Sequence, residues 1–87
     1  LGEILDEHLY EDLEIEIRLK ALKTPGVLGV GNCVIRKSGM KYHVDIDIKV
    51  DSQISVFHGH EIAHRLHDDF QTQIPLISQI LVHVEPF

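Results

Sequence analysis

Apolar residues recur at helical spacing over residues 3–23, which is the pattern of an amphipathic helix with one face in a core. Leu9, Leu13 and Ile17 lie four positions apart and define the stripe that we expect to be buried. The pattern stops at the Thr-Pro-Gly sequence of residues 24–26. Proline disfavours helical geometry in the residue before it, and glycine permits the turn that follows. The sequence therefore predicts a first helix over residues 3–23.

Two segments rich in β-branched residues follow, and they are separated by Ser38-Gly39. Residues 27–37 form the first segment, and residues 40–50 alternate strictly between apolar and polar side chains. Alternation of this kind puts one set of side chains in a core and the other set on a polar sheet face. The polar set is His43, Asp45, Asp47 and Lys49. We expect a β-hairpin with its turn at residues 37–40.

A second helix is predicted over residues 56–72, after a connection at residues 51–54. Ser55 is a suitable N-cap, because its hydroxyl can accept a hydrogen bond from the first turn of a helix. At helical spacing, the residues expected to be buried are Gly59, Ile62, Ala63, Leu66 and Phe70. A separate narrow stripe at the border of this face carries His60, His64 and His67.

A third strand is predicted over residues 77–84, because the Gln-Ile-Pro sequence at 73–75 breaks the second helix and alternation then returns. Ile80, Val82 and Val84 are expected to face the core. His83 and Glu85 share the opposite face, and Pro86 should end the pairing.

The resulting order, α-β-β-α-β, predicts an α+β fold: a two-layer sandwich with a three-stranded mixed sheet and both helices on one face. A helix between the second and third strands implies a right-handed crossover and parallel pairing if these strands are neighbours. With 87 residues, the chain is a single domain near the size at which one hydrophobic core is marginal. We therefore expect an oligomer.

Composition excludes several partners. The net charge of -6, from 14 acidic and 8 basic side chains, argues against a nucleic-acid partner, because phosphate binding needs clustered Lys and Arg. No apolar run approaches the ~20 residues that span a bilayer, so we expect no membrane insertion by this segment. Cys33 is the only cysteine, which excludes an intrachain disulfide and favours a buried strand thiol. Seven histidines are more than a chain of this length usually carries.

Imidazole and carboxylate groups are the ligands that transition metals of borderline softness prefer. His83 and Glu85 lie two apart on one strand, and Asp45 and Asp47 lie two apart on another. His60 borders a helix that packs on the same sheet. The sequence thus predicts a metal site. The alternative is that the carboxylates are solvated sheet residues and the histidines only tune packing.

The segment from His60 to His64 formally matches the His-Glu-x-x-His motif of zinc hydrolases. Such enzymes need a third ligand and a substrate cleft on a larger scaffold, for which a sandwich of 87 residues has little room. We therefore expect that the chain is not an enzyme.

Three segments together resemble the C-terminal cytoplasmic domain of cation diffusion facilitator transporters. They are Thr-Pro-Gly-Val at 24–27, the helix start with Gly59-His60-Glu61, and the terminal His83-Val84-Glu85-Pro86. The resemblance covers about residues 10–87. It implies a metallochaperone-like fold and a V-shaped homodimer on the cytoplasmic side of the cell membrane. In that family, divalent metal, often zinc, binds near the subunit interface and draws the two arms together.

Site residues follow from the resemblance by position. His60 matches the helix ligand, His83 the terminal-strand ligand and Glu85 the acid after it. Asp47 falls where some members place a histidine ligand, and Asp45 falls where others place an aspartate. Gly31 falls where some members carry a further histidine, so a second, bridged metal is not implied. Four further histidines, His43, His58, His64 and His67, are expected to be bystanders or auxiliary ligands.

The resemblance implies a metal-sensing regulatory domain of residues 1–87, with residues 1–9 as a helical linker toward the transmembrane domain of the same transporter. Zinc is the expected ion, and Mn, Fe, Co, Cd and Ni suit the same ligands. Metal competes with protons for histidine nitrogens, so binding by His60 and His83 should weaken as the pH falls. The alternative function is a structural or small-ligand-binding dimerisation module without metal regulation.

Overall fold

A computed structural model describes the backbone of residues 2–87 and the side chains from residue 9 onward. Leu1, the first residue of the predicted linker, lies outside the described residues. The elements are α1 (Gly2–Lys23), β1 (Gly29–Ser38), β2 (Lys41–Val50), α2 (Val56–Gln73) and β3 (Ile77–Pro86). The predicted order of two helices and three strands is confirmed.

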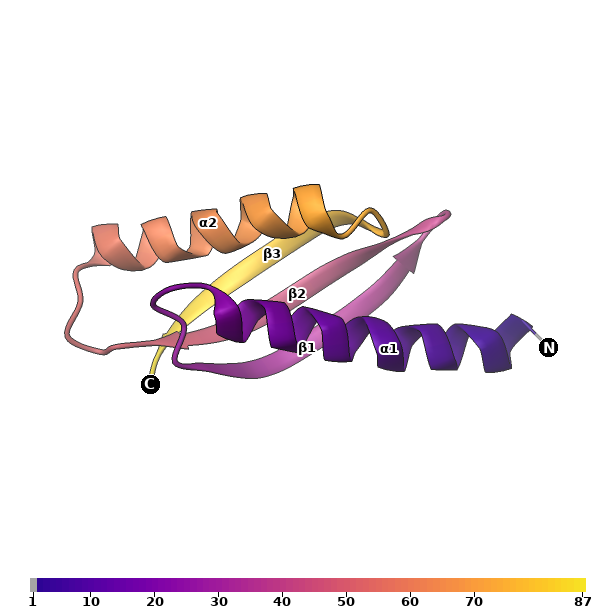
Figure 1. Cartoon of the computed structure of the whole chain (residues 1–87), viewed down its shortest axis with the longest axis horizontal. Helices are drawn as coiled ribbons and strands as arrows, with labels where there is room; N and C mark the ends of the chain where they lie inside the picture. Colours follow the sequence, from indigo (N-terminus) through magenta and orange to yellow (C-terminus); the bar gives the residue numbers. More distant parts are fainter. Residues whose placement is uncertain (1) are drawn as a thin grey trace.

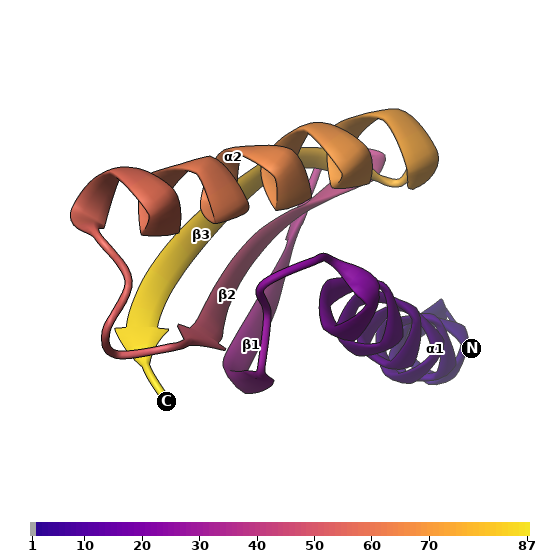
Figure 2. The same cartoon turned by 60° about the vertical axis from the view of Figure 1, so that its left-hand side comes forward.

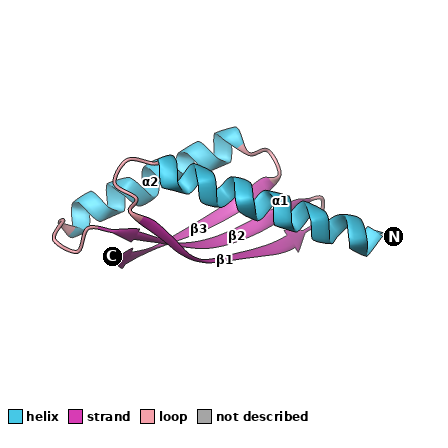
Figure 3. Cartoon of the chain, turned by 60° about the horizontal axis from the view of Figure 1, so that its bottom comes forward, coloured by secondary structure: helices cyan, strands magenta, loops and turns pink. Residues whose placement is uncertain are grey.

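The three strands form one sheet in the order β1-β2-β3. β1 and β2 pair antiparallel, whereas β2 and β3 pair parallel across the connection that contains α2. Both helices cover the same face of the sheet, α1 over β1 and α2 over β3 (Figures 1 and 2). The other face carries no helix (Figure 3). The predicted two-layer α+β sandwich with a mixed sheet is confirmed.

The hairpin turn lies one residue later than the sequence predicts. β1 ends at Ser38 and β2 begins at Lys41, so only Gly39 and Met40 connect them. Gly39 has a φ of 64°, which a two-residue type II′ turn requires at its first position and which glycine adopts without strain. The turn fixes the register in which β1 and β2 meet.

A bulge interrupts β1 near its start. Val30 pairs with Ile48 and Cys33 pairs with Ile46, so Gly31 and Asn32 together lie opposite Asp47. An extra residue on one strand bends that strand and re-aims the side chains around it. The bulge therefore shapes the sheet surface next to Asp47.

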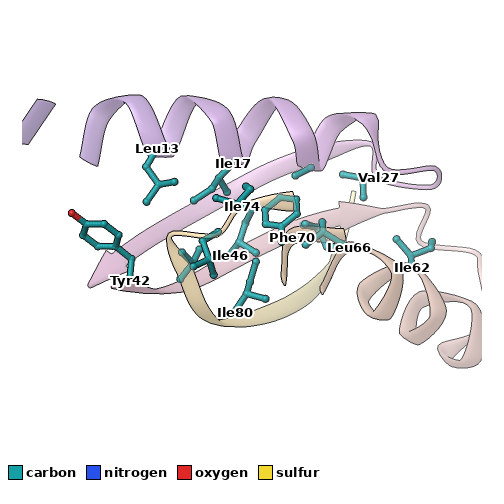
Figure 4. Close-up of a cluster of buried hydrophobic side chains, with 14 of the residues drawn as sticks. Leu13, Ile17, Val27, Tyr42, Ile46, Ile62, Leu66, Phe70, Ile74 and Ile80 are labelled. Carbon is teal, nitrogen blue, oxygen red and sulfur yellow. The ribbon is translucent and has the colours of Figure 1, made fainter. Parts of the chain in front are cut away.

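The core lies between the sheet and the two helices (Figure 4). α1 contributes Leu13 and Ile17, and α2 contributes Leu66 and Phe70, all of them at most 4% exposed. The predicted inward set of β2 is buried at every position: Tyr42, Val44, Ile46, Ile48 and Val50.

The predicted buried stripe of α1 is wrong at its first member. Leu9 is 46% exposed, and the first turns of α1 extend past the end of the sheet (Figure 1). On α2, Ala63 is half-buried, whereas the other predicted core residues are buried. Neither helix, as far as the chain is described, is both long and apolar enough to cross a membrane.

Candidate metal centre

Three of the predicted ligands, Asp47, His83 and Glu85, meet on the open face of the sheet. The parallel register pairs Asp47 on β2 directly with His83 on β3. Glu85 lies two residues after His83, so it projects from the same face. One ligand atom from each residue lies within 4.8 Å of the other two. Across residues 9–87, no other group of three or more His, Cys, Asp or Glu side chains lies this close together.

The distances in this group match those around a small metal ion. His83 Nδ1 lies 3.3 Å from Asp47 Oδ1 and 3.6 Å from Glu85 Oε2. Ligand atoms held at about 2.1 Å from a tetrahedral ion lie about 3.4 Å from one another. One nitrogen and two oxygens could therefore bind a single ion with little rearrangement and leave a fourth position for another ligand.

The group is open to solvent on one side. The Asp47 side chain is 22% exposed and that of Glu85 is 34% exposed, whereas that of His83 is 68% exposed. Two partly buried carboxylates facing one imidazole make the local potential negative, which favours a cation over an anion. An ion could reach the site without any opening of the fold.

Gly31 leaves room beside the two carboxylates. A Cβ atom added there would lie 3.2 Å from Asp47 Cβ and 3.6 Å from Glu85 Oε1. The Gly31 carbonyl accepts a hydrogen bond of 3.0 Å from Arg18 Nη1, which ties this part of the bulge to α1. The bulge thus places a residue without a side chain where a larger residue would press on the ligands.

Asp45 lies on the same face as Asp47 but interacts with a different partner. Arg36 on β1 donates from Nη1 to Asp45 Oδ2 at 3.2 Å and from Nη2 to Oδ1 at 3.4 Å. The sequence analysis missed Arg36. The position of the turn decides this contact, because the Gly39-Met40 connection, one residue later than predicted, places Arg36 opposite His43 and hence diagonal to Asp45.

His60 does not join the group of Asp47, His83 and Glu85. It lies on α2, over the sheet face that carries Val82 and Val84, whereas His83 projects from the opposite face. His60 and Glu85 do border the same groove, a space of about 380 Å³ between the start of α2 and the end of β3. The fold of one protomer thus leaves His60 at the margin of the site.

The four further histidines of residues 9–87 are distributed over both faces of the sheet. His43 lies on the open sheet face, in register with Arg36 and Gln79. His58 borders a hollow next to Pro25 and Gly26. His64 and His67 continue the line of His60 along α2, and the His60 and His64 rings lie 4.4 Å apart between centroids.

Cys33 lies on β1, as expected for a strand thiol, but it is half-buried and not buried. Burial raises the pKa of this thiol to about 11, with a further increase from the nearby Glu14 carboxylate and a small opposing effect from Arg18. The thiol is therefore protonated at neutral pH, which makes it a poor nucleophile and a poor metal ligand.

Comparison with known proteins places the whole fold in one family. The sequence profile of the family described as "Cation efflux protein, cytoplasmic domain" matches residues 9–87. The cation-efflux pump FieF of Shewanella oneidensis is 30% identical over 87 residues, which covers 95% of this chain and 29% of that protein. A probable cation efflux system protein of Mycobacterium tuberculosis is 29% identical over 62 residues, covering 71% of this chain and 19% of that protein. The chain therefore spans less than a third of the curated relatives it matches.

Solved structures of similar fold support the same family assignment. The MamM CTD superposes with a TM-score of 0.86 at 28% identity, covering 90% of this chain and 99% of that one. MamM CTD variants have also been solved in copper, cadmium and manganese forms, with TM-scores of 0.86. This family consists of transporter domains and is not a family of enzymes.

Proposed function

The chain belongs to the family of cytoplasmic domains of cation efflux proteins, the cation diffusion facilitators, and we propose that it is the metal-sensing, homodimerising domain of a divalent-cation efflux transporter. Residues 1–87 then form one regulatory domain, and residues 1–9 form a helical linker toward the transmembrane domain of the same transporter. The observation that carries the proposal is the convergence of Asp47, His83 and Glu85.

The proposed ion is zinc. One imidazole and two carboxylates form a mixed nitrogen and oxygen ligand set, and the spacing of their donor atoms suits a tetrahedral ion. Related ions such as Mn, Fe, Co, Cd and Ni can use the same ligands with different preferences. The metal forms of the MamM CTD variants support the choice of a divalent transition metal, although they concern that protein.

His60 and Asp45 complete the proposed set in different ways. His60 sits across the β3 edge from the three clustered ligands, so a second protomer that docks along this edge can offer its own His60 as the fourth ligand. Asp45 is held by Arg36, so it can bind metal only after that ion pair opens. We therefore assign Asp47, His83 and Glu85 as primary ligands, His60 as a ligand across the dimer border and Asp45 as auxiliary.

A ligand shared across a dimer border gives a mechanism for sensing. Metal binds the closed dimer better than the open one, because only the closed dimer brings all four ligands together. The equilibrium then shifts toward the closed state by as much as the difference in affinity allows. Metal concentration in the cytoplasm is thereby converted into a change of shape that the transmembrane domain can follow.

Zinc titration monitored by thermal unfolding tests the proposal. Zinc that binds only the folded protein raises the melting temperature. A free zinc concentration of about 100 times the Kd adds about 2.7 kcal/mol to the free energy of unfolding. We expect this rise in the wild type and its loss in His83→Ala. His43→Ala is the matched control, because it removes an imidazole from the same sheet face outside the group of three.

Two outcomes oppose the proposal. An unchanged melting temperature at saturating zinc would show that the contacts among Asp47, His83 and Glu85 are ordinary ion pairs of a structural dimerisation module. An equal rise in wild type and in His83→Ala would place the metal elsewhere.

A further inference from the structure

Along the outer side of α2, three histidines form a line that the proposed site does not use as a unit. His60 and His64 are four residues apart, so their side chains lie one above the other on the helix surface. Their ring centroids are 4.4 Å apart with a tilt of 57° between the rings. The next pair, His64 and His67, is wider, with centroids 6.5 Å apart.

The spacing of the first pair suits chelation of one ion. Two imidazoles that bind a metal at about 2.1 Å with the bond angle near 90° of square-planar coordination have ring centroids about 4.5 Å apart. His60 and His64 are already at 4.4 Å, and both are exposed, so their side chains are free to turn a nitrogen of each ring toward one ion. A helix holds its i and i+4 positions rigidly, so little conformational freedom is lost on binding.

The surroundings of the pair also favour an ion. His60, His64 and His67 border a groove of about 270 Å³ between α2 and β3, whose floor is formed by Ile80, Leu81 and Val82. The apolar side chains on one side of the groove lower the local dielectric next to the exposed imidazoles, which strengthens the bond between a cation and its ligands. His67 Nδ1 lies 3.1 Å from Asp68 Oδ1, which orients that ring at the far end of the groove.

We propose that His60 and His64 form a second metal site on α2, selective for divalent ions that prefer imidazole. Two imidazole nitrogens without a carboxylate, at a spacing that suits a bond angle near 90°, favour Cu²⁺ and Ni²⁺ over tetrahedral Zn²⁺ and over Mn²⁺ and Mg²⁺. The site is complete within one protomer, whereas the proposed sensing site becomes complete only across the dimer border. His60 belongs to both, so the helix site fills in the open dimer and releases His60 on closure.

Copper binding separates the two sites. In an Asp47→Ala/His83→Ala background, the clustered ligands on the sheet are removed and the α2 pair is intact. We expect about one Cu²⁺ per chain by calorimetry, with hyperfine coupling to two nitrogens in the EPR spectrum. Adding His64→Ala should weaken binding at least about tenfold and remove the second nitrogen coupling. Adding His58→Ala instead is the matched control, since His58 lies on α2 but outside the pair, and it should change neither.

The proposal of a metal site on α2 is contradicted if the Asp47→Ala/His83→Ala variant binds no copper. It is also contradicted if His64→Ala leaves the copper affinity and the nitrogen coupling unchanged. Either result leaves the proposed sensing function standing, because that function depends on zinc stabilisation of the wild type and its loss in His83→Ala. Circular dichroism of each variant in chelator verifies that the fold is retained.

Discussion

Gly31 is the residue whose lack of a side chain most directly affects the candidate metal centre. Its position opposite Asp47 leaves less than an ordinary van der Waals separation for any Cβ, at 3.2 Å from Asp47 Cβ. The backbone at Gly31 does not have a positive φ, so glycine is needed here for space and not for conformation.

We predict that Gly31→Ala weakens zinc binding about tenfold, because Asp47 must move by a few tenths of an ångström and loses its alignment with His83. The melting temperature in chelator should change by only about a few degrees, since the added methyl group also restricts the unfolded chain. Isothermal titration and thermal unfolding provide the two readouts. Gly29→Ala is the control, because its Cβ would meet its nearest neighbour at 3.5 Å. Equal zinc affinity in both variants would contradict the role of Gly31.

Asp45 and Asp47 cannot be told apart as candidate ligands from the sequence pattern alone. Both lie on the polar face of the same strand, so alternation alone treats them as equal candidates. Their neighbours separate them, since Arg36 pairs with Asp45 while His83 lies next to Asp47. Charge pairing across strands depends on register, and register is set by the Gly39 turn and by β2 pairing with β3.

The start of α2 is determined by a local feature of the sequence, the N-cap residue Ser55. Ser55 has extended backbone geometry, and its side chain accepts a hydrogen bond of 3.0 Å from the backbone N–H of His58. This N-cap was predicted from sequence and is confirmed. It starts the helix at the point where the groove shared by His60 and Glu85 begins.

We predict that Ser55→Ala lowers the free energy of unfolding by about 1 kcal/mol, because one N–H group of the first helical turn loses its partner. Urea denaturation in chelator measures the change. Ser52→Ala is the matched control: Ser52 is exposed in the same connection, and its hydroxyl accepts only from the Gln53 side chain. If both variants lose the same stability, the cap is not the cause.

At the scale of the whole molecule, the sheet face opposite α1 and α2 is the surface that the two helices leave uncovered (Figure 3). A protomer has a Cα radius of gyration of 13.4 Å and is elongated, with extents of 48 × 20 × 17 Å. Two elongated arms that change their angle alter the radius of gyration of the pair measurably, even when each arm stays rigid.

We predict that zinc reduces the radius of gyration of the wild-type dimer in small-angle X-ray scattering, because metal shared across the dimer border draws the arms together. In the His83→Ala variant, the dimer should keep, at every zinc concentration, the radius of gyration that it has in the presence of chelator. A wild-type dimer whose dimensions are insensitive to zinc would identify the domain as a scaffold, even if metal binds.

The sequence by itself determined which residues could reach the site, and the tertiary structure decided which of them meet. Alternation along residues 40–50 and 77–84 placed Asp45, Asp47, His83 and Glu85 on polar strand faces, because side-chain direction in a strand depends only on local backbone geometry. Their convergence required the parallel register of Asp47 with His83, a long-range contact that no local pattern encodes. The same packing put α2 on the opposite sheet face, which separates His60 from Asp47, His83 and Glu85 within one chain.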